Sequence, residues 1–160
     1  MSAYPVYVAA PYARAPEVRA LHDELHARGC QPVSHWARLA KGLDTCATMG
    51  ASELASVNEL NDACIEKAAA VIALTFDGEG GEMFCEIERA RVAGVPVLWT
   101  GPRFIPTCAR TGVYVVSLAR ALDALARVAD VSSHPNARLS ARLRLHRFLL
   151  IDSEARVRCA

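Results

Sequence analysis

Two carboxylates, Asp62 and Glu86, stand on either side of the apolar run AVIALTF and are well suited by type to do chemistry. The glycines Gly80 and Gly81 follow that run, and they permit a sharp turn and a close backbone approach to a ligand. A helix that begins near Glu82 would present free N–H groups there, which bind anions or sugar hydroxyls. One turn into this helix, Glu86 would face the end of the strand and serve as a nucleophile or base.

These acidic side chains also have an ordinary structural explanation. Acidic residues are favoured in the first turns of helices, so Glu82, Glu86 and Glu88 can all be solvated partners of the helix dipole. Spacing alone favours that interpretation for Glu86. Asp62 has a poor helix propensity, and beside Asn61 it fits either a polar pair that points into a site or an exposed helix face.

Aromatic residues accompany the first two apolar segments. Tyr7 lies inside PVYVAAP, where its buried hydroxyl needs a partner, either a carboxylate or another core group. Tyr12 and Arg14 follow this segment, and Trp36 ends the weaker segment CQPVSHW. The indole can stack on a flat base, or it can pack in the core or in a lid.

Apolar runs alternate with helical patterns along the chain. Near-continuous apolar strands in this order predict an α/β fold: a three-layer sandwich with a five-stranded, mostly parallel sheet and helices on both faces. Such sheets bind ligands at the carboxyl ends of their strands, which selects the loops after Ala9, Phe76 and Trp99. The predicted strands are 5–11, 30–36, 70–76, 95–101 and 113–117, and the predicted helices are 15–29, 52–69, 82–94 and 118–128.

Local signals mark the ends of several helices, whereas 37–50 is ambiguous. Gly29 and Gly94 predict two helix ends, and Ser52 or Ser56 is a candidate N-cap. The residues expected on the inner face of the 52–69 helix are Leu54, Val57, Cys64 and Ile65.

Length and composition indicate one compact domain with a substantial core, because the chain has 160 residues and is 52% hydrophobic. Lys and Arg number 18 against 17 Asp and Glu, and this balance argues against nucleic acid as a partner. The six cysteines form no C-x-x-C pair and no Cys/His zinc spacing, so no metal site is expected. Cys30, Cys64 and Cys85 fall in apolar elements, which is typical of reduced, buried thiols.

The beginning of the chain has no signal-peptide pattern, and no apolar run approaches the roughly 18 to 20 residues that cross a bilayer. We therefore expect a cytoplasmic protein with no membrane partner. The motifs of ATPases, dinucleotide-binding folds, serine hydrolases and zinc peptidases are missing: no G-K-[ST], no G-x-G-x-x-G, no G-x-S-x-G and no H-E-x-x-H.

The character of the chain changes after residue 130. We expect an α/β domain over 1–130 and a basic C-terminal helix and tail over 131–160. This tail can dock on the core, on a partner subunit or on an anion. The tail has only two acidic residues but six arginines, which are Arg138, Arg142, Arg144, Arg147, Arg156 and Arg158.

Taken together, about residues 5 to 127 resemble the nucleoside 2-deoxyribosyltransferase family and its nucleotide N-glycosidase relatives. The family opens on a strand like YxAGP, which here reads Tyr7-Val8-Ala9-Ala10-Pro11. It carries N-D on the helix before the third strand, here Asn61-Asp62. Its later motif E-[IL]-G-x-A is matched by Glu86-Ile87-Glu88-Arg89-Ala90.

The resemblance implies a role for each matched residue. Glu86 would attack the anomeric carbon and form a glycosyl ester, Tyr7 would hold Glu86, and Asp62 would assist protonation of the leaving base. It also implies a small-molecule nucleoside or nucleotide as substrate, no cofactor, and a homo-oligomer. The expected substrate-binding positions are Pro11, Tyr12, Arg14, Trp36, Asn61, Asp77, Gly80, Gly81 and Glu82.

Three positions depart from the family pattern: Glu82 and Glu88 stand where glycine is usual, and Gly80 stands where an aspartate or serine is usual. Asp77 or Glu79 can supply the missing acid, and Arg14 can meet a 5′-phosphate. The departures leave two alternatives open. One is a nucleotide or nucleotide-sugar sensor of the same fold without catalysis, and the other is an interaction protein that acts through its basic tail.

Overall fold

The computed structural model describes residues 4–39, 49–75, 81–101, 112–130, 142–145, 147 and 149. Its strands form one sheet in the order β2-β1-β3-β4-β5, and each neighbouring pair is parallel. The predicted α/β fold with a five-stranded parallel sheet is therefore confirmed. The strands are β1 (Tyr4–Ala9), β2 (Cys30–Pro32), β3 (Ala70–Leu74), β4 (Val97–Thr100) and β5 (Val113–Val115).

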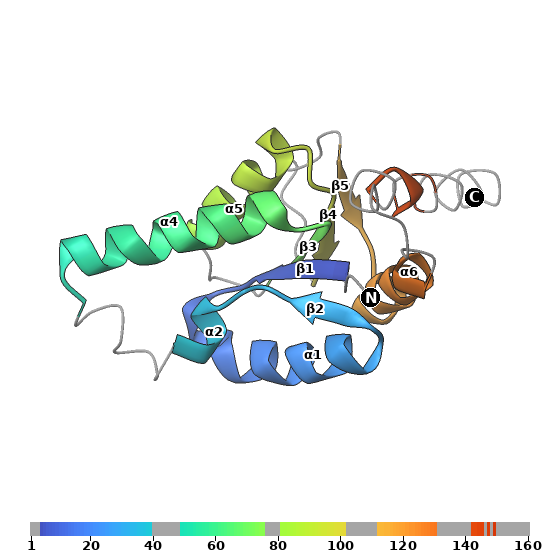
Figure 1. The fold of residues 1–160 in the computed structure, drawn as a ribbon, viewed down its shortest axis with the longest axis horizontal. Coiled ribbons are helices and arrows are strands. Elements are labelled where there is room, and N and C mark those ends of the chain that lie inside the picture. The colour runs from blue at the N-terminus through green and yellow to red at the C-terminus, as the bar shows by residue number, and fades with distance from the viewer. Residues whose placement is uncertain are drawn as a thin grey trace.

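Helices cover both faces of this sheet. Figure 1 shows α4 and α5 on one face and α1 and α6 on the other. Parallel strands need long crossover connections, and helices supply them on both faces of the sheet. The strand order reverses direction between β1 and β3. The helices are α1 (Ala15–Ala27), α2 (Trp36–Leu39), α4 (Ala51–Lys67), α5 (Gly81–Val92) and α6 (Leu118–Asp130), with a 3-10 turn η1 (Tyr12–Arg14). No helix in the described part of the chain is long and apolar enough to cross a membrane.

The core lies around the central strands. All five residues of β3 are buried, because helices cover both of its faces and leave no polar side. The same double coverage explains why the β3 sequence is apolar throughout rather than alternating. Tyr7 in β1 and Trp99 in β4 are among the largest fully buried side chains.

Two of the predicted helix ends are confirmed, and the predicted N-cap is wrong. Gly29 has a φ of 77° and Gly94 a φ of 67°, the left-handed conformation in which glycine ends helices at no steric cost. Helix α4 begins one residue earlier than expected, with Gly50 at its N-cap and no side-chain cap bond. Ser56 Oγ instead donates to the Ser52 carbonyl at 3.0 Å within the helix.

The second strand is shorter than the predicted 30–36. Backbone pairing between β1 and β2 ends with Val6 and Pro32, after which the Val33 N–H donates to the Val6 carbonyl at 2.9 Å. Beyond that point side chains replace the backbone of β2, and Trp36 starts the short helix α2 instead of ending a strand. This helix covers the first part of the segment 37–50 that the sequence left ambiguous; of the rest, 40–48 lies outside the described residues.

The described part of the basic C-terminal segment packs on the core. The Arg142 guanidinium donates to the carbonyls of Glu66 at 3.1 Å, Ala68 at 2.7 Å and Ala93 at 3.3 Å. These carbonyls lie at the C-terminal ends of α4 and α5, and helix C-termini carry partial negative charge. Leu145 and Leu149 are buried in the same core. Of the three docking partners that the sequence left open, Arg142 therefore takes the core.

Candidate active site

A tyrosine of β1 and a glutamate of α5 meet at the wall of a cavity. Tyr7 Oη on β1 donates to Glu86 Oε1 on α5 at 2.5 Å. Burial, and then the adjacent Glu86 carboxylate, raise the pKa of the Tyr7 phenol well above its ordinary value. The phenol therefore keeps its proton as a donor, and it fixes one oxygen of a half-buried carboxylate against the sheet.

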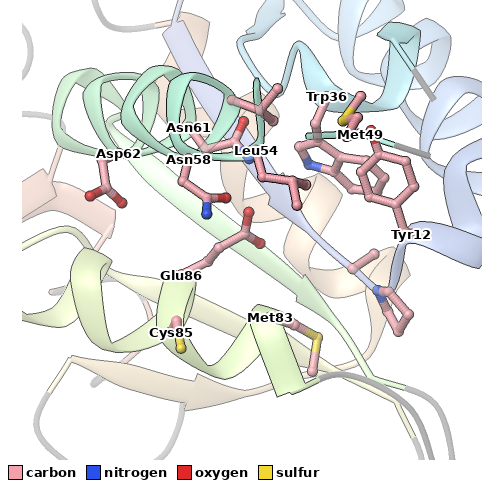
Figure 2. A pocket seen from close by; sticks show the side chains of 13 residues that line it. Tyr12, Trp36, Met49, Leu54, Asn58, Asn61, Asp62, Met83, Cys85 and Glu86 are labelled. Carbon is pink, nitrogen blue, oxygen red and sulfur yellow. The ribbon is translucent and has the colours of Figure 1, made fainter. Parts of the chain in front are cut away.

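Glu86 borders a cavity of about 470 Å³ beyond the carboxyl end of β1. Figure 2 shows its carboxylate projecting from α5 across the cavity toward α4. This is the edge of a parallel sheet at which ligands bind, next to the point where the strand order reverses. The lining residues are Ala10, Pro11, Tyr12, Trp36, Met49, Leu54, Val57, Asn58, Asn61, Asp62, Met83, Cys85 and Glu86.

An aromatic pair forms one side of the cavity. The rings of Tyr12 and Trp36 have centroids 5.3 Å apart and an interplanar angle of 31°. The indole is held in place by its Nε1–H, which donates to the Val8 carbonyl at 3.1 Å. A fixed aromatic surface of this kind can contact the face of a nucleobase, whichever base it is.

Polar side chains of α4 form the facing side of the cavity. Asn61 and Asp62 follow Asn58 by three and four residues, a spacing that puts side chains on one face of a helix. Asp62 is half exposed, and its Oδ2 lies 3.7 Å from the guanidinium of Arg89, which also bonds Glu66 at 2.6 Å. In Figure 2 the Asp62 carboxylate lies to one side of Glu86 and is not directed at it.

Most of the predicted site residues that the structure describes come together at this cavity. Glu86, Asp62, Asn61, Pro11, Tyr12 and Trp36 all line it, and Tyr7 lies behind Glu86. Arg14 is not among the lining residues, and its Nη1 bonds Glu17 at 3.1 Å.

The predictions on the glycine loop are only partly covered by the structure. Asp77, Gly80 and the possible substitute Glu79 lie outside the described residues. Gly81 is the first residue of α5, and Glu82 belongs to the same helix, but their side-chain surroundings are not described.

Sequence reasoning missed seven of the lining residues: Ala10, Met49, Leu54, Val57, Asn58, Met83 and Cys85. Asn58 had a usable signal, because it precedes Asn61 by three residues on the same helix. Leu54 and Val57 were expected on the inner face of their helix, and instead they are half-buried at the cavity.

The cysteines differ in their surroundings. Cys30 is buried, and burial raises the pKa of its thiol to about 11, as expected for an inert core cysteine. Cys64 is half-buried, with the pKa of its thiol raised for the same reason. The prediction is wrong for Cys85, which is exposed, because it is next to Glu86 on the side of α5 that borders the cavity.

The described cavity lining is acidic. Asp62 and Glu86 are its two charged residues, and none of the thirteen lining side chains is a lysine, arginine or histidine. Within the described ranges, no three His, Cys, Asp or Glu side chains group closely enough to hold a metal ion.

Comparison with solved structures identifies the fold. A 2-deoxyribosyltransferase from the psychrotolerant bacterium Bacillus psychrosaccharolyticus superimposes with a TM-score of 0.57 at 14% sequence identity, over 69% of this chain and 83% of the other. The fold is that of a 2-deoxyribosyltransferase. The CMP N-glycosidase of Clostridium botulinum is a looser match, with a TM-score of 0.43 at 15% identity over 76% of this chain and 82% of the other.

The resemblance read from the sequence is thus confirmed at the level of the deoxyribosyltransferase-like fold. Neither a protein-family model nor a curated protein matches the sequence. At 14% identity the likeness shows the fold and does not by itself assign the chemistry.

Proposed function

We propose that this protein cleaves or transfers at the N-glycosidic bond of a nucleoside or nucleotide, with Glu86 as the nucleophile. One observation carries the proposal: the buried phenol of Tyr7 holds the Glu86 carboxylate at the edge of a cavity that opens beyond the carboxyl end of β1. A carboxylate fixed in this way meets the anomeric carbon of a bound sugar without first having to be ordered. The aromatic pair on one side of the cavity and the amides on the other suit a base and a sugar.

The proposed reaction has two steps. Glu86 attacks C1′ and forms a glycosyl ester, the C1′–N bond breaks, and its electron pair leaves with the base, which takes a proton from Asp62 or from water. Water or a second base then attacks C1′, donates its proton to the solvent or to Asp62, and releases the Glu86 carboxylate. Water as acceptor gives hydrolysis, and a base gives transfer.

The test is incubation of the purified protein with a panel of ribonucleosides, 2′-deoxynucleosides and their 5′-monophosphates, with and without a free acceptor base. Chromatography detects released or exchanged base, and mass spectrometry detects a glycosyl group on the Glu86 peptide. We expect both signals to be lost in Glu86→Ala. Base release at the wild-type rate by Glu86→Ala would overturn the nucleophile assignment.

A second candidate function is binding of a nucleotide or nucleotide-sugar without turnover. The ion pair of Asp62 with Arg89 favours it, because Arg89 occupies the side chain that would otherwise assist protonation of a leaving base. A sensor of this kind would show ligand-induced thermal stabilisation and no free base after long incubation. Slow base release that depends on Glu86 would decide against the sensor.

A further inference from the structure

A histidine, a serine and a tryptophan complete the edge of β1 where β2 has ended. Val8 is the next residue of β1 whose N–H and carbonyl point to the β2 side, two positions after Val6. Its N–H donates to Ser34 Oγ at 3.1 Å, and its carbonyl accepts from Trp36 Nε1 at 3.1 Å. Two side chains thus replace the pair of backbone hydrogen bonds that a longer β2 would make with Val8.

The hydroxyl of Ser34 is in turn bonded by a side chain of α1. His22 of α1 places its Nε2 2.8 Å from Ser34 Oγ, and both side chains are buried, at 4% and 1% exposure. Ser34 Oγ accepts the Val8 N–H, and it has one proton of its own, which it can donate to an unprotonated Nε2 of His22. A neutral His22 that accepts this proton completes the chain of bonds, whereas a protonated His22 can only donate through Nε2 and makes the Ser34 hydroxyl turn its proton elsewhere.

We propose that His22 is a positioning residue for the cavity. It orients the Ser34 hydroxyl, and Ser34 and Trp36 together bond the backbone of Val8 where β2 has ended. These bonds hold the indole in its place against Tyr12. The same helix holds α2 at a second point, where Arg19 Nη1 donates to the Ala37 carbonyl at 2.9 Å. His22 lies on the α1 side of the sheet and does not line the cavity, so any effect on a ligand passes through Ser34 and Trp36.

The surroundings of His22 agree with this role. Burial, and then the nearby Arg38, lower the pKa of His22 to about 4, and His26 and His35 act in the same direction. Asp23 opposes them. These charged groups come from α1, from the turn before α2 and from α2 itself. Near pH 7 His22 is thus neutral and able to accept the Ser34 proton.

The decisive experiment uses 5-fluorotryptophan labelling and 19F NMR, because the chain has two tryptophans, Trp36 and Trp99. Trp99 lies on β4 beside Phe84, at 6.0 Å between ring centroids, and serves as the internal control. We expect His22→Phe and Ser34→Ala to shift or broaden the Trp36 resonance and to leave the Trp99 resonance in place. His22→Gln, whose side-chain oxygen replaces Nε2 as an acceptor, should restore the wild-type spectrum.

A titration of the wild-type protein gives the same answer without relying on a substitution. The folded-state pKa of about 4 is below the ordinary 6.5, so the unfolded chain binds this proton more readily. The His22 contribution to stability is complete above 6.5 and is lost as the pH falls toward 4. In that acid range the Trp36 resonance should move as His22 gains its proton, and His22→Gln should remove this movement.

The inference depends on the proposed function only for its effect on catalysis. In an active enzyme Ser34→Ala should raise KM about tenfold, the usual effect of one lost buried hydrogen bond, with a smaller change in kcat. An unchanged Trp36 resonance in both His22→Phe and Ser34→Ala, or equal changes at Trp36 and Trp99, would overturn the inference even if base release is found. A protein without turnover that gives the expected spectra would support the inference and contradict only the proposed function.

Discussion

The two helices that face each other across the cavity are anchored very differently. Helix α5 buries Met83, Ile87 and Ala90 against the sheet, and its Glu86 is bonded to a buried phenol. Helix α4 has seventeen residues, of which Ile65 alone is buried. The α5 side therefore combines the core with the Glu86 carboxylate, whereas most of α4 is available to a ligand.

This difference separates two requirements of a catalytic site. A nucleophile must be held in a fixed position, and burial of the surrounding helix provides that. A binding surface needs polar and apolar groups in reach of the ligand, and few buried contacts leave α4 free to adjust. Substitutions in the two helices can show whether chemistry resides on α5 and recognition on α4.

The largest effect is expected from Glu86→Gln, which keeps an acceptor for Tyr7 but removes the nucleophilic charge. We expect kcat for base release to fall by at least about 10³-fold, as for other lost nucleophiles. Ligand binding to the α4 side should persist in thermal-shift measurements. Glu88→Gln is the matched control, because Glu88 is on the same helix but pairs with Arg91 at 3.0 Å. An equal loss in both variants would contradict a special role of Glu86.

The next test compares an anchor of α5 with an apolar residue of α4. Ile87 is 1% exposed in the core, and its truncation to alanine should lower the free energy of unfolding by about 3 kcal/mol. Leu54 lines the cavity and is half-buried, so Leu54→Ala should cost less than about 1 kcal/mol and weaken ligand binding instead. Urea unfolding and ligand titration measure the two effects. Similar unfolding costs would remove the contrast between the helices.

Tyr7→Phe tests whether Glu86 needs its buried partner. Loss of a hydrogen bond to a charged group should lower kcat about 10- to 100-fold while the fold is retained. Tyr4→Phe is the matched control on the same strand, because Tyr4 is also buried and its hydroxyl has no hydrogen-bond partner among the described residues. That variant should keep wild-type kcat and equal or slightly higher stability. A loss in Tyr4→Phe as large as in Tyr7→Phe would point to general packing instead.

The smallest effect is expected at Asp62. Its contact with Arg89 is half exposed, so Asp62→Asn should change the free energy of unfolding by less than about 1 kcal/mol. Base release should slow about tenfold if Asp62 supplies the proton, less than for a buried general acid. Glu66→Gln breaks the other ion pair of Arg89 without altering the cavity lining and should keep full activity. Equal activity in the two variants and the wild type would remove Asp62 from the mechanism.

Most of the sheet could be read from the sequence, because buried parallel strands leave an uninterrupted apolar signal. The run 70–76 predicted β3 in this way, and Gly94 marked the end of the following helix through its backbone freedom. The error at 30–36 has a physical cause as well. Side chains of Ser34 and Trp36 complete β1 where a strand was expected, and this substitution leaves no trace in hydrophobic periodicity.

The candidate site was only partly accessible to sequence reasoning. Family resemblance and residue type selected Glu86 and Asp62, and both line one cavity. Spacing alone could not separate an exposed glutamate near a helix start from a nucleophile, since both patterns are identical along the chain. Asn58 could have been found from its spacing to Asn61, but His22 could not, because its importance comes from a bond to a residue of another element.

The sequence by itself determined the order of strands and helices, their parallel arrangement and the edge of the sheet where a ligand would bind. These follow from local propensity and the period of apolar residues, which act over a few neighbours. Only the tertiary structure decided that Glu86 meets Tyr7, a residue 79 positions away, and that Asp62 contacts Arg89. Such pairings depend on how helices pack on the sheet and on which polar groups lose water there, and neither is encoded in any local stretch of the chain.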